Sequence, residues 1–112
     1  MENTVLCGAN SYKEKYYFNP AFAALPEDIK KELQIMCVTY TEEAGGIITM
    51  EFGPEGDLQF KTMVDDGDIY FDEIESGIII SRMQKEKSEL FQQLELFYKV
   101  FVLKEELQTP EN

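Results

Sequence analysis

The segment from residue 48 to residue 64 constrains the fold most, because its apolar and polar side chains alternate on both sides of a turn. Ile48, Met50 and Phe52 are separated by polar residues, and the alternation resumes after the turn GPEGD with Leu58, Phe60, Thr62 and Val64. A period of two is typical of a strand with one buried face, and the Gly-rich turn favours pairing of adjacent strands. The sequence therefore predicts an antiparallel hairpin whose apolar face must be covered by other elements.

The residues before this hairpin predict further strands and one helix. Short β-prone pieces at residues 4–7 and 12–18 predict one or two strands. Pro26 and the acids after it indicate a helix start, with the proline in the first helical position. Apolar residues recur at helical spacing up to Tyr40. We expect this helix to end at Tyr40 or Thr41, because Glu42 and Glu43 are unfavourable at the negative end of a helix dipole.

The residues after the hairpin predict a short strand and a long last helix. Residues 69–71 (IYF) form a possible third strand after the hairpin, and Asp72 with Glu75 has the spacing of a capping box. From there a helix is predicted to Lys104, although Gly77 and three following isoleucines leave a fourth strand open as an alternative. This helix of roughly 48 Å is longer than the roughly 34 Å diameter of such a domain. Either it kinks near Gly77 or a second copy of the chain covers its apolar end.

The last helical turns supply the predicted interface of a homodimer. Aromatic and apolar residues lie on nearly every side of that segment, more than one domain face can bury. The interface candidates are Phe97, Tyr98, Phe101 and Val102. The predicted fold is a single α+β domain over residues 1–107, with a frayed tail at 108–112. Its small antiparallel sheet, built from the N-terminal strands and the central hairpin, packs against two helices, of which the C-terminal one is long.

Charge and composition argue against several functions. Eleven of the 22 acidic residues and one of the ten basic residues lie between Glu42 and Glu75. A net charge of −12 disfavours binding to nucleic acid or to an anionic membrane. Histidine is absent, which removes the usual general base and the commonest transition-metal ligand. We therefore expect no enzyme activity and no cofactor. The lack of a long apolar run and the presence of two cysteines alone predict a cytoplasmic protein with reduced thiols.

The string DDGDIYFDE resembles a calcium-binding loop, since acidic loops supply oxygen ligands. The metal-ligand candidates are the acids Asp65, Asp66, Asp68, Asp72 and Glu73. If Gly67 takes the glycine position of an EF-hand, however, the first and third ligand positions fall on Thr62 and Val64. A solvated turn followed by a helix cap is therefore the preferred interpretation. Cys37 lies on the apolar face of the first predicted helix and is interpreted as a core residue, whereas Cys7 is less certain.

Four segments together resemble a known family: LCGANSYKEKYYFNP, LPEDIKKELQIMCVTYTEEAGGIITMEF, DDGDIYFDEI and QKEKSELFQQLELFYKVF. The resemblance is to small acidic proteins of unknown function from clostridia and related Firmicutes, and it implies a bacterial cytoplasmic protein. The predicted α+β homodimer is also similar in outline to bacterial secretion chaperones. The preferred hypothesis is a noncatalytic, chaperone-like or regulatory interaction protein with an acidic surface for a basic or unfolded partner. The alternatives are an acidic decoy that imitates nucleic acid and a small metal-binding protein that uses residues 65–75.

Overall fold

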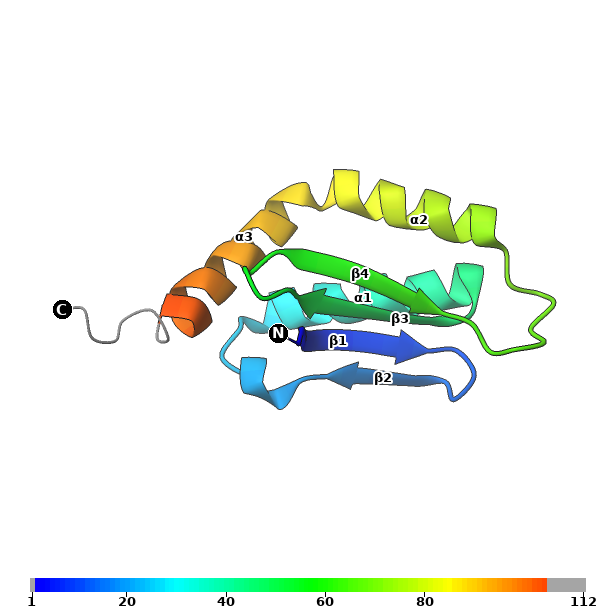
Figure 1. The fold of residues 1–112 in the computed structure, drawn as a ribbon, viewed down its shortest axis with the longest axis horizontal. Coiled ribbons are helices and arrows are strands. Elements are labelled where there is room, and N and C mark those ends of the chain that lie inside the picture. Colours follow the sequence, from blue (N-terminus) through cyan, green and yellow to red (C-terminus); the bar gives the residue numbers. More distant parts are fainter. Residues whose placement is uncertain (1, 105–112) are drawn as a thin grey trace.

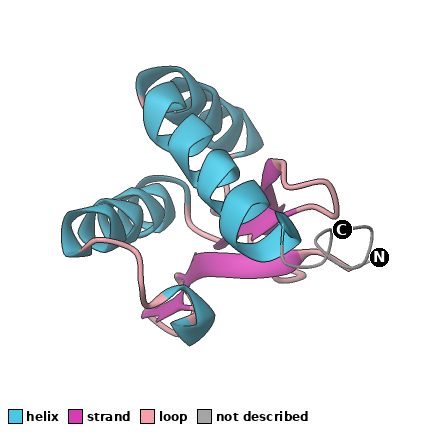
Figure 2. Ribbon diagram, turned by 90° about the vertical axis from the view of Figure 1, so that its left-hand side faces the viewer, coloured by secondary structure: helices cyan, strands magenta, loops and turns pink. Residues whose placement is uncertain are grey.

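The computed structural model describes residues 2–104, which form a four-stranded antiparallel sheet with the α-helices on one of its sides (Figure 1 and Figure 2). The strands are β1 (Thr4–Asn10), β2 (Lys15–Phe18), β3 (Ile47–Phe52) and β4 (Leu58–Met63). Their order across the sheet is β2-β1-β3-β4, so the N-terminal hairpin and the central hairpin join through β1 and β3. The predicted α+β class and the central hairpin are confirmed.

The alternation that predicted the hairpin is visible in the burial of β3. Ile48, Met50 and Phe52 are buried against the helices, and the residues between them are half-buried. In β1 the pairing with β3 shifts between Val5 and Cys7, which marks a β-bulge at Leu6. A bulge places two successive side chains where a regular strand places one. Leu6 and Cys7 are accordingly both buried.

The first α-helix, α1, runs from Glu27 to Ala44 and so continues past the predicted end at Tyr40 or Thr41. Glu42 and Glu43 are exposed to solvent, where an unfavourable dipole interaction costs only about 0.3–1 kcal/mol. The extra turn also buries Ala44. Gly45 then ends the helix with a φ of 81°, a conformation that glycine adopts easily because it has no Cβ. A short 3₁₀ helix, η1 (Pro20–Phe22), lies between β2 and α1.

The predicted long C-terminal helix is present, but it is divided at Lys87. It consists of α2 (Glu73–Glu86), α3 (Ser88–Tyr98) and the π-helical turn η2 (Lys99–Leu103). Gly77 lies within α2, so the fourth-strand alternative is wrong and the bend is not near Gly77. Figure 1 shows that the bend turns α3 toward the start of β4, where the Leu58 N–H donates to the Glu95 carboxylate at 2.8 Å. Because the helix bends at Lys87, its length does not by itself require it to extend beyond the domain.

Two other predictions fall on loops and chain ends. Residues 69–71 do not form a strand. They lie in a turn, because the Asp68 carboxylate accepts the Tyr70 backbone N–H at 3.0 Å and so competes with strand pairing.

The end of the predicted domain at residues 105–107 and the predicted tail at 108–112 lie outside the described residues. Within residues 2–104, every helix is too short or too polar to cross a lipid bilayer.

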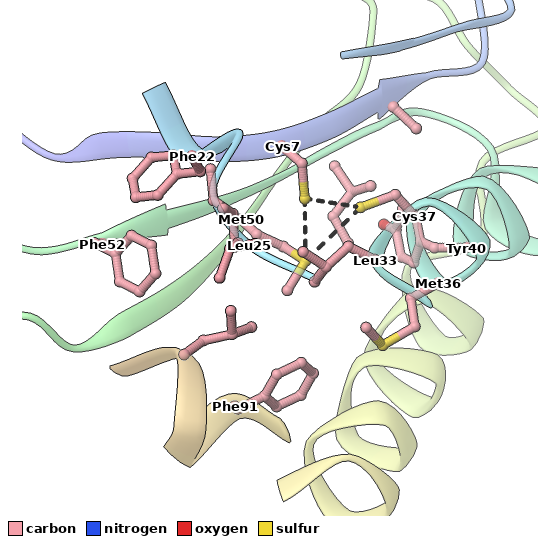
Figure 3. Packing of buried hydrophobic residues seen from close by; sticks show 14 of the residues in the cluster. Cys7, Phe22, Leu25, Leu33, Met36, Cys37, Tyr40, Met50, Phe52 and Phe91 are labelled. Atoms are coloured by element: carbon pink, nitrogen blue, oxygen red, sulfur yellow. Dashed lines mark hydrogen bonds between the residues drawn. The ribbon is translucent and has the colours of Figure 1, made fainter. Parts of the chain in front are cut away.

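The hydrophobic core lies between the sheet and the helices (Figure 3). The ring of Tyr98 on α3 stacks on that of Phe52 on β3, with ring centroids 4.3 Å apart. Nearer the N-terminus of α3, the ring of Phe91 meets that of Phe60 on β4 edge-on, with ring centroids 5.1 Å apart. Aromatic contacts of this kind add to the energy of burial. They fix α3 on the sheet beyond the bend at Lys87.

Candidate functional site

The acidic residues predicted as a candidate site lie in the connection between β4 and α2. We refer to residues 63–74 as the acidic–apolar loop. Its turn is closed by the Asp68 N–H, which donates to the Asp65 carbonyl at 3.1 Å, and Gly67 adopts a φ of 86° inside it. A positive φ strains residues that carry a Cβ, so a glycine favours this turn.

The acidic–apolar loop is joined to the turn after β1 through Tyr12. The Tyr12 hydroxyl donates to Asp68 Oδ2 at 2.5 Å and accepts the Asp65 N–H at 3.1 Å. This hydrogen bond raises the pKa of Tyr12 above its ordinary value, since the donor must keep its proton. The same bond holds the pKa of the Asp68 carboxyl below its usual value. Two turns that are far apart in the sequence thus meet at one end of the sheet (Figure 1).

The other acids of the loop have separate positions. Asp72 caps α2 by accepting the Glu75 N–H at 3.0 Å, as the capping-box spacing predicted. Glu73 is in the first helical turn, and Asp65 and Asp66 are exposed to solvent. Among residues 2–104, no group of three or more Cys, Asp or Glu side chains is placed to hold a metal ion. The geometry therefore gives the cation hypothesis no support.

The apolar members of the loop are the feature that the sequence analysis missed. Ile69, Tyr70 and Ile74 have exposed fractions of 82%, 89% and 76%, and Met63 is 64% exposed. Phe71 points the other way, since its ring would lie within 3.1 Å of a Cβ placed on Gly46. These four exposed apolar side chains lie within twelve residues of the chain, and exposed apolar surface of this kind is a candidate contact site. Blocks of acids and apolar residues follow one another from residue 63 to residue 74, and this mixture is the signal that an interpretation as a turn, a short strand and a helix cap leaves unused.

The predicted interface residues on the last helix fall into two groups. Tyr98 lies in the core, with its hydroxyl 3.0 Å from that of Thr4, and so is not accessible to a partner. Phe101 is 60% exposed and contacts the half-buried Phe97, with ring centroids 4.9 Å apart, and Val102 is half-buried. Leu96, which belongs to the same apolar end of the predicted helix, is also exposed. This surface and the acidic–apolar loop lie at opposite ends of the sheet (Figure 1).

A comparison with known protein families identifies the family of this chain. A family model described as a family of unknown function, DUF6145, matches residues 3–106. The chain belongs to this family. The match covers every strand and helix that the structure describes. No curated protein and no solved structure matches the chain. Membership in DUF6145 assigns no activity or site residue, and the functional argument depends on the geometry.

Proposed function

We propose that this member of DUF6145 is a noncatalytic interaction protein whose acidic–apolar loop binds a basic, amphipathic or unfolded segment of another protein. The observation that carries the proposal is the exposure of Ile69, Tyr70 and Ile74 among five carboxylates. Apolar side chains supply most of the favourable energy of association, and the charges select and steer a basic partner. The proposal places the protein in a bacterial cytoplasm, as its family resemblance implies.

The charge around the loop supports a basic partner. Among the described residues, none of the five loop carboxylates takes part in an ion pair with a lysine or arginine of the chain. Their charge is thus available to an incoming cationic segment. A decoy of nucleic acid needs carboxylates alone, whereas exposed isoleucine and tyrosine side chains add apolar contacts that suit a protein. The loop therefore favours a protein partner over the decoy alternative.

A peptide-binding experiment tests the proposal. The probe is a synthetic amphipathic helical peptide with leucines on one face and lysines along the borders of that face, and its binding is followed by fluorescence anisotropy. We expect binding at low salt that weakens strongly near 0.5 M salt, where screening is stronger than at physiological ionic strength. Ile69→Ser with Tyr70→Ser should abolish binding, because the apolar contacts are lost. As a control, Tyr17→Ser changes an exposed tyrosine of the sheet and should leave binding unchanged.

Two results would contradict the proposal. One is the absence of binding to the peptide at low salt, together with recovery of no partner from a lysate of the source cells. The other is binding that is equally weakened by the loop variant and by Tyr17→Ser, since this would indicate nonspecific adsorption.

The proposal includes a homodimer formed through the C-terminal end of α3 and η2. Leu96, Val100 and Phe101 are exposed there, and π-helical turns such as η2 are frequent at functional sites. We expect light scattering to give the mass of two chains, and Phe101→Glu to give that of one. The loop variant Ile69→Ser is the matched control, because it removes an exposed apolar residue at the other end of the sheet. A single-chain mass for the unaltered protein would contradict the dimer and leave the peptide test unaffected.

A further inference from the structure

Three sulfur atoms meet in the core where β1, α1 and β3 pack together (Figure 3). Cys7 Sγ lies 3.8 Å from Cys37 Sγ and 3.7 Å from Met50 Sδ, and Cys37 Sγ lies 3.8 Å from Met50 Sδ. Cys7 and Met50 are direct neighbours across the β1–β3 pairing, and Cys37 faces them from α1. All three residues are fully buried, and both cysteines are free thiols. The three atoms thus form a nearly equilateral triangle.

We propose that Cys7, Cys37 and Met50 form a three-coordinate binding site for one Cu(I) ion. The centre of a triangle with these sides lies about 2.2 Å from each sulfur, which is within about 0.2 Å of a usual metal–thiolate distance of about 2.3 Å. Two thiolates and a thioether are soft ligands, and such ligands select Cu(I) over harder divalent ions. The three elements therefore hold the ligands near coordination distance with little movement of the chain.

Cu(I) binding changes the charge at the sulfurs, and this change bears on a fourth residue, Tyr16. Cu(I) replaces the two thiol protons, which pass to solvent, and no electrons are transferred; the complex of one cation and two thiolates has a net charge of −1. Tyr16, on β2, has a hydroxyl that is shielded from solvent and has no hydrogen-bond partner among residues 2–104. That hydroxyl is close enough to Cys7 to interact with its thiol. A thiolate at Cys7 would give this O–H an acceptor.

An access route to the sulfurs follows from the same residue. A hollow of about 580 Å³ opens between the turn after β1 and the helix α1, and Tyr16 forms part of its wall. Glu14 and Glu42 also line it. Lys15 is the one cationic group among the described residues of the wall, so the two carboxylates leave the hollow with a net negative charge that attracts a cation. In the proposal, this hollow is the entry side and Tyr16 is the side chain that moves to admit the ion.

Competition for Cu(I) under anaerobic conditions tests the site. The fully reduced protein is titrated against a chromogenic Cu(I) chelator, with the metal added either to the folded protein or during refolding, since the sulfurs are buried. We expect one Cu(I) per chain and an X-ray absorption spectrum with three sulfur neighbours at about 2.2–2.3 Å. Met50→Leu, a volume-conserving change that removes one ligand, should weaken binding by at least about 10-fold.

The matched control is Met36→Leu, which makes the same change at a buried methionine of α1 outside the sulfur triangle. It should leave Cu(I) affinity unchanged. Sulfur atoms packed only to fill the core also approach to such distances, and in that case the chelator keeps all the copper in both arms, which overturns the proposal. Equal affinity of Met50→Leu and Met36→Leu, or two sulfur neighbours in the spectrum, also overturns it. So does a chain whose mass shows a Cys7–Cys37 disulfide that persists under reducing conditions.

Discussion

The hydrogen bond between Tyr40 and Ser76 is the sharpest test of how α2 is positioned. The two hydroxyl oxygens are 2.7 Å apart, and both residues are buried. Tyr40→Phe removes one hydroxyl without changing the shape of the ring, so the Ser76 hydroxyl is left buried without its partner. Such a loss costs about 1–3 kcal/mol. For a domain with a free energy of unfolding of about 5–15 kcal/mol, this is a large fraction.

A double-mutant cycle isolates the pair. Ser76→Ala strands the Tyr40 hydroxyl and should also destabilise the protein, although alanine recovers a few tenths of a kcal/mol through its higher helix propensity. The double variant removes both polar groups and should be more stable than the sum of the single changes indicates, by about 1 kcal/mol. Urea unfolding measures all four free energies, provided that the slope of the transition is unchanged.

Tyr17→Phe is the control for this cycle, because it removes a hydroxyl from an exposed tyrosine and should change stability by less than about 0.5 kcal/mol. Strictly additive effects, or a Tyr40→Phe variant as stable as the unaltered protein, would refute the packing of α2 on α1. The position of the acidic–apolar loop would then be in error as well, because the loop leads directly into α2.

Three further predictions follow from single contacts. Lys87→Met breaks an ion pair with Glu32 whose side chains are both 38% exposed, so urea unfolding should show a loss below about 1 kcal/mol that shrinks as salt is added. Tyr12 should ionise above the usual pH of a tyrosine in a spectroscopic titration, and Tyr12→Phe should remove that transition; its bond to Asp68 stabilises the fold while Tyr12 is protonated, and this contribution is lost as pH rises through the raised pKa or falls through the lowered pKa of Asp68. Tyr98→Ala removes a core ring and should cost about 3–5 kcal/mol in thermal or urea unfolding, and a loss below 1 kcal/mol would show that α3 does not pack on the sheet.

The parts of the fold that were predictable are those in which one physical period dominates. The alternation around Met50 fixed the hairpin, and the spacing of Asp72 and Glu75 fixed the start of α2. The bend at Lys87 was not predictable, because no proline or glycine occurs there and its side chain pairs with Glu32 across a tertiary contact. Sequence spacing carries no information on such a contact.

The candidate sites were less predictable than the fold for a related reason. The register of β1 depends on a bulge at Leu6, and without that bulge Cys7 and Met50 would not face Cys37 on the same side of the sheet. A single-residue shift reverses every side chain of a strand, and nothing in the sequence around Leu6 marks the extra residue. The sulfur triangle therefore becomes visible only in three dimensions.

The acidic–apolar loop combines order with exposure, and this combination has an energetic consequence. Its backbone is held at one point by Tyr12 and at another by the Asp72 cap, while Ile69 and Tyr70 contribute little to the core. The conformational entropy of the loop is thus lost when the protein folds, before any partner arrives. A partner then meets a loop backbone that is already in place, so less of the binding energy is consumed in ordering it. The exposed apolar residues reduce the solubility of the free protein, and the surrounding carboxylates counter this through their charge. In the proposed function, the same acids both select a basic partner and oppose association of the unbound surface with other copies of itself.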